Sequence, residues 1–287
     1  MQYESEKINH RYIDLLKKVL IDFHHVNSIE YKPLYAVEGN LKIRILSIVN
    51  SMLEKSNLQI CRRAKFSLDN RLVGADWPSQ ADTMIGMKRL ENIEYCINQI
   101  INDNISGDLI ETGVWRGGAT IFMKAMLKVR NNTDKIVWVA DSFEGLPKPD
   151  EVKYQADKGD QHFKFKELAV SEETVRSNFE KYDLLDQNVK FLKGFFRDTL
   201  PRAPINSLSL LRLDGDMYES TMDALIHLYP KLEKGGFLIV DDWGAVPACK
   251  QAILDYRKEH DINDEILIID WAGIYWRKSA ERKEVLS

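Results

Sequence analysis

The sequence predicts an α/β fold in which helices flank a mostly parallel sheet. Strand-like and helix-like segments alternate after about residue 105, a pattern typical of a parallel sheet covered by helices on both faces. A glycine-rich turn follows the first of these strands, and aspartates follow two later ones. Ligands of open α/β sheets bind beyond the carboxyl ends of the strands, so these residues mark the expected site.

Residues 1–104 are predicted to form a helical extension that precedes a sheet domain of residues 105–287. Apolar residues recur at helical spacing in three segments of the extension: residues 11–23, 40–58 and 87–101. A loop-like stretch that contains Trp77 and Pro78 separates the last two segments. The extension is therefore expected to be mostly helical.

The sheet domain can be divided into elements in chain order. Strands are expected at residues 108–112, 135–140, 189–192, 208–213 and 237–240, followed by an antiparallel pair at 266–270 and 274–277. Helices are expected at residues 116–129, 171–182, 220–232 and 248–260. Ser171 is a suitable amino-terminal cap for its helix, because Glu172 and Glu173 follow in the first turn.

Composition argues against several classes of protein. The 287 residues are 44% hydrophobic and 29% charged, with a net charge of −4 and a pI of about 5.9. This balance does not suggest nucleic-acid binding. Neither an 18-residue apolar run nor a signal-type apolar stretch is present, so no membrane span is expected. Three widely spaced cysteines favour free thiols in a reducing cytoplasm over a zinc site.

Acidic residues follow two apolar strands of the predicted sheet. Asp214 and Asp216 come after the strand at 208–213, and Asp241 and Asp242 come after the strand at 237–240. Carboxylates gathered there repel one another unless a cation joins them, and Mg²⁺ prefers such oxygen ligands. The alternative is that these residues cap helices, although only one of two adjacent aspartates can do so. Because neighbouring strand residues point to opposite faces, the second strand must end or bulge there.

The turn after the first strand has the features of a nucleotide site. Gly113, Gly117 and Gly118 allow a ligand to approach the backbone before a helix begins. Glu111 would repel a pyrophosphate, and it suits the cationic amino-acid end of S-adenosylmethionine. A tight structural turn is the alternative. After the second strand, Asp141 would accept both ribose hydroxyls.

Adjacent to Asp141, Phe143 either stacks on adenine or belongs to the core. Further along, His162 lies in a long polar segment, residues 154–166, that would form a lid over the acceptor. His162 either contacts that acceptor or is simply a loop residue.

These motifs resemble the macrocin O-methyltransferase family, whose members methylate sugar hydroxyls of antibiotics with S-adenosylmethionine and Mg²⁺. The resemblance extends over residues 10–278. It is carried by residues 76–78, 83–86, 107–118, 139–147, 211–225 and 240–242. It implies a class I methyltransferase fold, a Rossmann-like seven-stranded sheet flanked by helices. The expected acceptor is a hydroxyl of a (deoxy)sugar on a natural product or glycoconjugate, and a homodimer is compatible with this prediction.

The resemblance also implies roles for individual residues. The metal ligands would be Asp214, Asp241 and Asp242, and Asp216 would be the general base. The S-adenosylmethionine contacts would be Glu111, Thr112, Gly113, Val114, Trp115, Gly117, Asp141, Ser142 and Phe143. Thr83 and Met84 would close over that ligand, and Gly194 and Phe195 would hold adenine.

The expected chemistry begins from the weak acidity of an alkyl hydroxyl. A divalent cation lowers the pKa of an oxygen bound to it, and Asp216 would remove the proton. The alternative for Asp216 is a structural turn residue.

Other function classes remain open. A methyltransferase acting on a non-sugar hydroxyl and a non-catalytic cofactor-binding protein share this fold. A dinucleotide oxidoreductase does so too, but the chain lacks its GxGxxG fingerprint. The sugar would be part of a metabolite glycoside, a surface polysaccharide or a nucleotide sugar.

Overall fold

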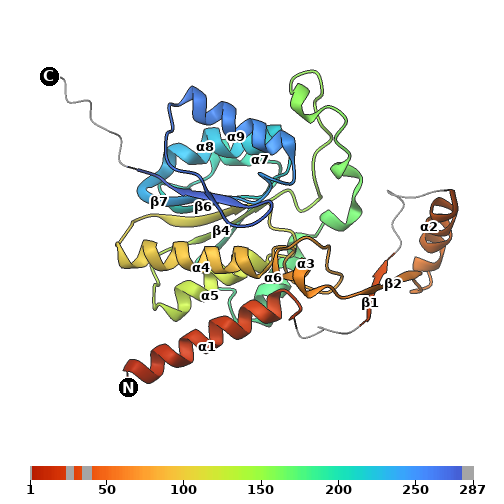
Figure 1. Ribbon diagram of the computed structural model, residues 1–287, viewed down its shortest axis with the longest axis horizontal. Helices are drawn as coiled ribbons and strands as arrows, with labels where there is room; N and C mark the ends of the chain where they lie inside the picture. The colour runs from red at the N-terminus through yellow and green to blue at the C-terminus, as the bar shows by residue number, and fades with distance from the viewer. Residues whose placement is uncertain (1, 24–28, 34–40, 280–287) are drawn as a thin grey trace.

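A seven-stranded, mostly parallel sheet forms the centre of the molecule, as predicted (Figure 1). The computed structural model describes residues 2–23, 29–33 and 41–279. The strand order is β5-β4-β3-β6-β7-β9-β8. The bounds are β3 Asp108–Thr112, β4 Val137–Asp141, β5 Val189–Lys193, β6 Leu208–Leu213, β7 Leu232–Val240, β8 Leu267–Ile268 and β9 Ile274–Arg277. The strands from β5 to β7 are parallel, and β9 pairs antiparallel with both β7 and β8.

Alternation along the strands divides the core between the two faces of the sheet. Leu109 and Leu210 face one apolar cluster, whereas Ile110 and Leu211 face the other. Helices α4 Met87–Asn102, α5 Gly118–Val129 and α6 Glu172–Lys181 contribute to the first cluster. Helices α8 Tyr218–Leu228 and α9 Pro247–Glu259 cover the second face, as Figure 1 shows. Both layers were expected from the sequence.

The amino-terminal part contributes to the same core as the sheet. Ile13, Leu16 and Leu20 of α1 Gln2–Leu20 are buried with residues of α4 and α5. A two-stranded antiparallel sheet, β1 Ile29–Pro33 with β2 Cys61–Lys65, stands apart with α2 Leu41–Glu54 (Figure 1). The mostly helical pattern predicted for this region did not include these two strands or the short α3 Leu68–Leu72. The division at residue 105 stays a prediction.

Two element boundaries differ from prediction for conformational reasons. Helix α5 begins at Gly118 rather than at residue 116, because Trp115 and Gly117 have φ of 48° and 86°. Strand β7 begins at Leu232 rather than at residue 237. It contains Gly235 with φ of 84°, a value that favours glycine.

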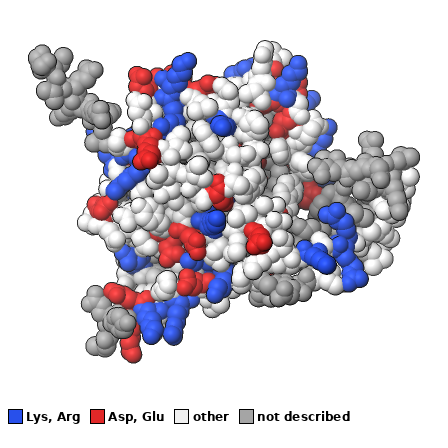
Figure 2. Space-filling view, in the orientation of Figure 1, with Lys and Arg blue, Asp and Glu red and all other residues white. Residues whose placement is uncertain are grey.

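The surface is mixed in charge. Figure 2 shows acidic and basic side chains interspersed over one face of the described molecule. Within the described ranges, no helix combines the length and apolar character that a bilayer crossing requires.

Candidate active site

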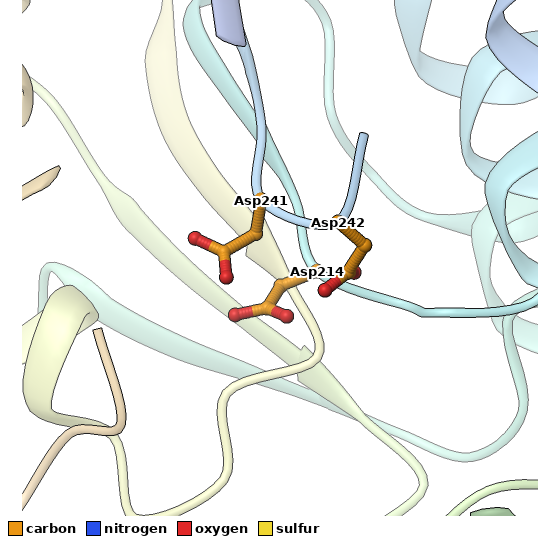
Figure 3. A group of neighbouring side chains, drawn as sticks. All are labelled: Asp214, Asp241 and Asp242. Atoms are coloured by element: carbon orange, nitrogen blue, oxygen red, sulfur yellow. The ribbon is translucent and has the colours of Figure 1, made fainter. Parts of the chain in front are cut away.

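Three aspartates meet at the carboxyl ends of β6 and β7. Asp214 follows β6, and Asp241 and Asp242 both lie beyond the last residue of β7, Val240. Strand β7 therefore ends just before the two adjacent aspartates, as expected if both are to serve one ion. One carboxylate oxygen from each aspartate lies within 4.8 Å of those of the other two, and the side chains converge in Figure 3.

A buried arginine joins these carboxylates, a partner that the sequence analysis missed. Arg212 of β6 lies in register with Glu111 of β3, and its side chain is fully buried. It forms ion pairs with Glu111 and Asp241, and its Nη1 lies 2.7 Å from Oδ2 of Asp214. A buried guanidinium is costly unless it is paired, and three carboxylates pair this one.

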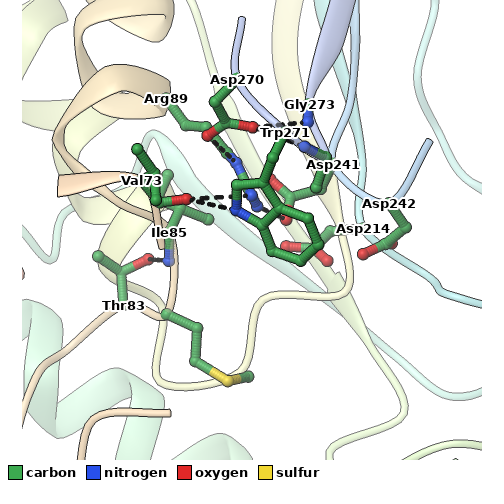
Figure 4. Close-up of polar contacts among 12 residues, drawn as sticks. Val73, Thr83, Ile85, Arg89, Asp214, Asp241, Asp242, Asp270, Trp271 and Gly273 are labelled. Atoms are coloured by element: carbon green, nitrogen blue, oxygen red, sulfur yellow. Dashed lines mark hydrogen bonds and ion pairs between the residues drawn. The ribbon is translucent and has the colours of Figure 1, made fainter. Parts of the chain in front are cut away.

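A second arginine reaches the same cluster from α4. Arg89 is 5% exposed and pairs with Asp241, while its Nε donates to Oδ2 of Asp270 at 2.8 Å (Figure 4). Asp241 therefore lies between Arg89 and Arg212. Asp214 lies two residues from Arg212, but the other carboxylates that these arginines contact are distant in sequence, so no short motif predicts the cluster.

The cluster remains acidic after both arginines are counted. Arg89 and Arg212 contact Glu111, Asp214, Asp241 and Asp270, and Asp242 adds a fifth carboxylate, so the carboxylates outnumber the two arginines. Burial and the neighbouring carboxylates hold the pKa of Asp214 and Asp242 well above the usual range. A carboxylate oxygen that accepts from arginine keeps a second lone pair. The donor set therefore suits a hard divalent cation.

Asp216 lies beside this cluster in a left-handed turn. Its φ is 56°, and its backbone N–H donates to Oδ2 of Asp242 at 3.1 Å. Burial raises the pKa of Asp216 to about 6, and nearby His162 opposes that rise. The residue is thus both part of a tight turn and an ionisable group of the site. The two roles considered for Asp216 from the sequence, general base and structural turn residue, are therefore compatible.

A first cavity lies over the ends of β3, β4 and β6. The predicted residues that line it are Met84, Gly113, Trp115, Asp141, Ser142 and Phe195. It is also lined by Asp214 and Asp216, and by residues that the sequence analysis missed: Gly145, Leu146, Pro147, Leu168, Phe196, Arg197, Gly215, Glu219, Ser220 and Asp223. We call it the donor cavity. Gly113 is required there, because a Cβ would lie 1.6 Å from the carbonyl oxygen of Asp214.

Asp141 is held in the wall of the donor cavity by backbone N–H groups. Oδ1 accepts from Phe143 N–H and Oδ2 from Val114 N–H, both at 2.8 Å. Burial raises the pKa of Asp141, and these hydrogen bonds oppose that rise. Its remaining lone pairs can accept ligand hydroxyls.

Several predicted contacts do not line the donor cavity. They are Thr83, Glu111, Thr112, Val114, Gly117, Phe143 and Gly194. Phe143 is a core residue, 5% exposed, with its ring 6.1 Å from that of Phe191, which favours the core role among its two alternatives. Thr83 is also buried, and its Oγ1 accepts from Ile85 N–H at 3.3 Å.

Glu111 differs from the other residues of this group, because one of its carboxylate oxygens is buried without a partner among the described residues. Oε1 pairs with Arg212, whereas Oε2 is buried with no hydrogen-bond partner in the described part of the chain. Burial raises the pKa of Glu111 to about 7, against the effect of Arg212. A buried, unpaired carboxylate oxygen two residues before Gly113 suits an ammonium group of a ligand.

A second cavity adjoins the first and contains the acidic cluster. Met84, Leu168, Asp214 and Asp216 line both cavities. The walls of the second are formed by residues 74–77, 156–160, 245–248 and 271–272, with Arg89, His162, Asp241 and Asp242. We call it the acceptor cavity.

A family profile of macrocin O-methyltransferases (TylF) matches residues 9–278. The chain belongs to this family. It is 52% identical to demethyldecarbamoylnovobiocin O-methyltransferase of Streptomyces niveus over 219 residues, 76% of this chain and 84% of that protein.

The same identity, 52%, is found with 8-demethyl-8-(2,3-dimethoxy-alpha-L-rhamnosyl)-tetracenomycin-C 4'-O-methyltransferase of Streptomyces olivaceus. That match spans 216 residues, 74% of this chain and 81% of the relative. The solved O-methyltransferase NovP superposes with a TM-score of 0.81 at 43% identity, over 95% of this chain and all of that one. The protein is therefore a class I O-methyltransferase, and its methyl donor is S-adenosylmethionine.

The polar segment expected as a lid forms three short 3₁₀ turns in this methyltransferase, η2 Gln155–Asp157, η3 His162–Lys164 and η4 Lys166–Leu168. Asp157 caps α8 by accepting from Tyr218 and Glu219 N–H at 2.6 and 3.0 Å. Trp115 Nε1 donates to Glu167 O at 2.8 Å. The segment thus connects the two cavities.

Proposed function

We propose that this methyltransferase transfers the methyl group of S-adenosylmethionine to a sugar hydroxyl of a natural product or glycoconjugate, with Mg²⁺ as its metal. The observation that carries the proposal is the meeting of the two cavities at Asp214 and Asp216, beside the acidic cluster. The rhamnosyl group in the name of one relative supports a sugar acceptor. Cytoplasmic location and a homodimer remain predictions.

The donor cavity would hold S-adenosylmethionine, which supplies an electrophilic methyl group when bound. Asp141 would accept from the ribose hydroxyls, and Phe195 would lie at adenine. Glu111, at the end of the strand that leads into Gly113, would receive the ammonium group at its buried, unpaired Oε2. Met84 and Leu168 line both cavities, so their apolar side chains would exclude water from the transfer path.

Asp214, Asp241 and Asp242 would hold Mg²⁺, which when bound supplies Lewis acidity to an oxygen of the acceptor. Arg89 and Arg212 fix the orientation of Asp241 from opposite sides. Asp216 would accept the hydroxyl proton, because a general base is effective when its pKa lies near the working pH. Asp216 lines both cavities from its left-handed turn.

The test is product analysis with S-adenosylmethionine that carries a deuterated methyl group. The acceptors are a panel of deoxysugar glycosides with phenols as non-sugar controls, and mass spectrometry and NMR locate the label. The proposal predicts the label on a sugar oxygen. Transfer to phenols alone would instead establish a non-sugar acceptor.

A further inference from the structure

Two tryptophans at the mouth of the acceptor cavity are half exposed. Trp77 is 46% exposed and Trp271 is 52% exposed, and both line the cavity. Asp241 and Asp242, in contrast, are 5% and 7% exposed. The cavity therefore has a buried acidic end and an open aromatic rim.

Both rings are fixed in place by neighbouring residues. Trp77 packs edge-on against Phe165 of the lid segment, with ring centroids 5.3 Å apart. Trp271 donates from Nε1 to Val73 O at 2.9 Å, and the Arg89 guanidinium lies 5.9 Å from its ring (Figure 4). A side chain that is fixed before binding loses little freedom when a ligand arrives.

The charge of the cavity limits what can lie on this rim. Seven aspartates line the cavity against one arginine, one lysine and one histidine. Arg71 also pairs with Asp76, and Arg212 pairs with Asp214 and Asp241, yet the aspartates still outnumber these cationic side chains. A phosphate or carboxylate on the acceptor would therefore be disfavoured. Large aromatic side chains bind uncharged flat or apolar groups well.

We propose that Trp77 and Trp271 form a binding subsite for an uncharged, flat aglycone next to the sugar. The inference rests on the proposed function, since it places the sugar at the acidic end. An aglycone on the rim covers both rings, and the attached sugar then reaches Asp214 and Asp216. A nucleotide sugar, which carries a diphosphate at the same distance from the sugar, is disfavoured by charge.

The test compares three probes that share one sugar: methyl α-L-rhamnoside, 4-methylumbelliferyl α-L-rhamnoside and dTDP-L-rhamnose. Calorimetry measures the affinity of each for the full chain saturated with S-adenosylhomocysteine and Mg²⁺. We expect the aryl glycoside to bind at least about tenfold tighter than the methyl glycoside, and the nucleotide sugar to bind weakest. Trp77→Ala and Trp271→Ala should each reduce the aryl preference by several fold.

Two further variants separate ring stacking from general structural effects. Trp271→Phe keeps an aromatic face but loses the hydrogen bond to Val73, so it should retain most of the aryl preference. Tyr31→Ala removes an exposed aromatic residue on β1, outside the cavity, and should leave the preference unchanged.

Equal affinities for the aryl and methyl glycosides, or an aryl preference that survives both alanine variants, would overturn the inference. Preferred binding of dTDP-L-rhamnose would overturn it as well. In all these cases methylation of a sugar oxygen would still uphold the proposed function. Absence of sugar methylation in the product analysis would reject the proposed function instead.

Discussion

At the scale of single residues, Asp241 lies between two buried arginines. The sequence predicted the aspartates, because acidic residues after apolar strands are a local signal. It did not predict the roles of Arg89 and Arg212, because Arg89 pairs with Asp241, 152 positions away, and Arg212 pairs with Glu111, 101 positions away, as well as with nearby Asp214. The assumption that only a metal would offset the carboxylates was therefore wrong, although the arginines offset them only in part.

Asp216→Asn tests the proposed base. Asparagine tolerates the left-handed conformation and keeps the backbone N–H that donates to Asp242, so the turn should survive. The turnover number should fall by about 10²–10⁴-fold, with S-adenosylhomocysteine affinity retained. Steady-state kinetics and calorimetry measure the two quantities. A folded variant with near-normal turnover at saturating Mg²⁺ would remove Asp216 from the mechanism.

Arg212→Met tests the buried ion pairs. The substitution leaves Glu111, Asp214 and Asp241 without this guanidinium, so the free energy of unfolding should fall by about 3–5 kcal/mol. Urea denaturation measures the change. Arg277→Met is the matched control, because its pair with Asp103 is about 40% exposed on both sides and should contribute about 0.2–1 kcal/mol. Equal losses in the two variants would contradict the assigned role of Arg212.

At the scale of elements, the turn after β3 depends on a close approach to β6. Gly113→Ala would place a Cβ 1.6 Å from Asp214 O, so it should separate the strand ends and weaken donor binding. Gly159→Ala is a matched control, because φ is 83° there against 87° at Gly113 but nothing lies within 4 Å. The control should cost about 1–2 kcal/mol from the left-handed backbone alone. Thermal denaturation showing equal shifts would disprove the contact.

The segment of residues 154–166 contains a pH-sensitive pair. Nδ1 of His162 lies 2.6 Å from Oδ2 of Asp160, and this hydrogen bond raises the pKa of His162 while the same contact lowers that of Asp160. Because the contact with Asp160 favours protonated His162, it contributes to the free energy of unfolding when His162 is protonated. That contribution is at its full value just below about pH 6.5 and is lost as pH rises through the pKa of His162 in the folded protein.

NMR titration of the His162 ring should therefore show a pKa above the usual 6.5 or so, and Asp160→Asn should lower it. A His162→Asn spectrum assigns the signal among the six histidines. A pKa that is the same in wild type and Asp160→Asn would mean that the pair does not form in solution.

The sequence predicted elements best where periodicity and length agreed. The bounds of β3 and β6 coincide with prediction, and Ser171 caps α6 by accepting from Thr174 N–H. The β1–β2 pair was missed because its strands are 5 residues long and separated by α2. Such pairing depends on tertiary contacts more than on local pattern.

At the scale of the whole molecule, the site joins segments from both ends of the chain. Arg89 of α4 contacts Asp241 after β7 and Asp270 before β9, and Trp271 donates to Val73. The amino-terminal part therefore completes the acceptor cavity rather than merely preceding the sheet. Arg89 lies both in the wall of that cavity and against the acidic cluster.

The central claim is that Asp214, Asp241 and Asp242 hold a divalent cation that methyl transfer requires. The most direct measurement is the initial rate of methyl transfer to a glycoside acceptor by enzyme freed of metal with a chelator, then titrated with Mg²⁺. We predict no turnover above background in the metal-free enzyme and saturable recovery as Mg²⁺ is added. Full turnover by the metal-free enzyme would contradict the account.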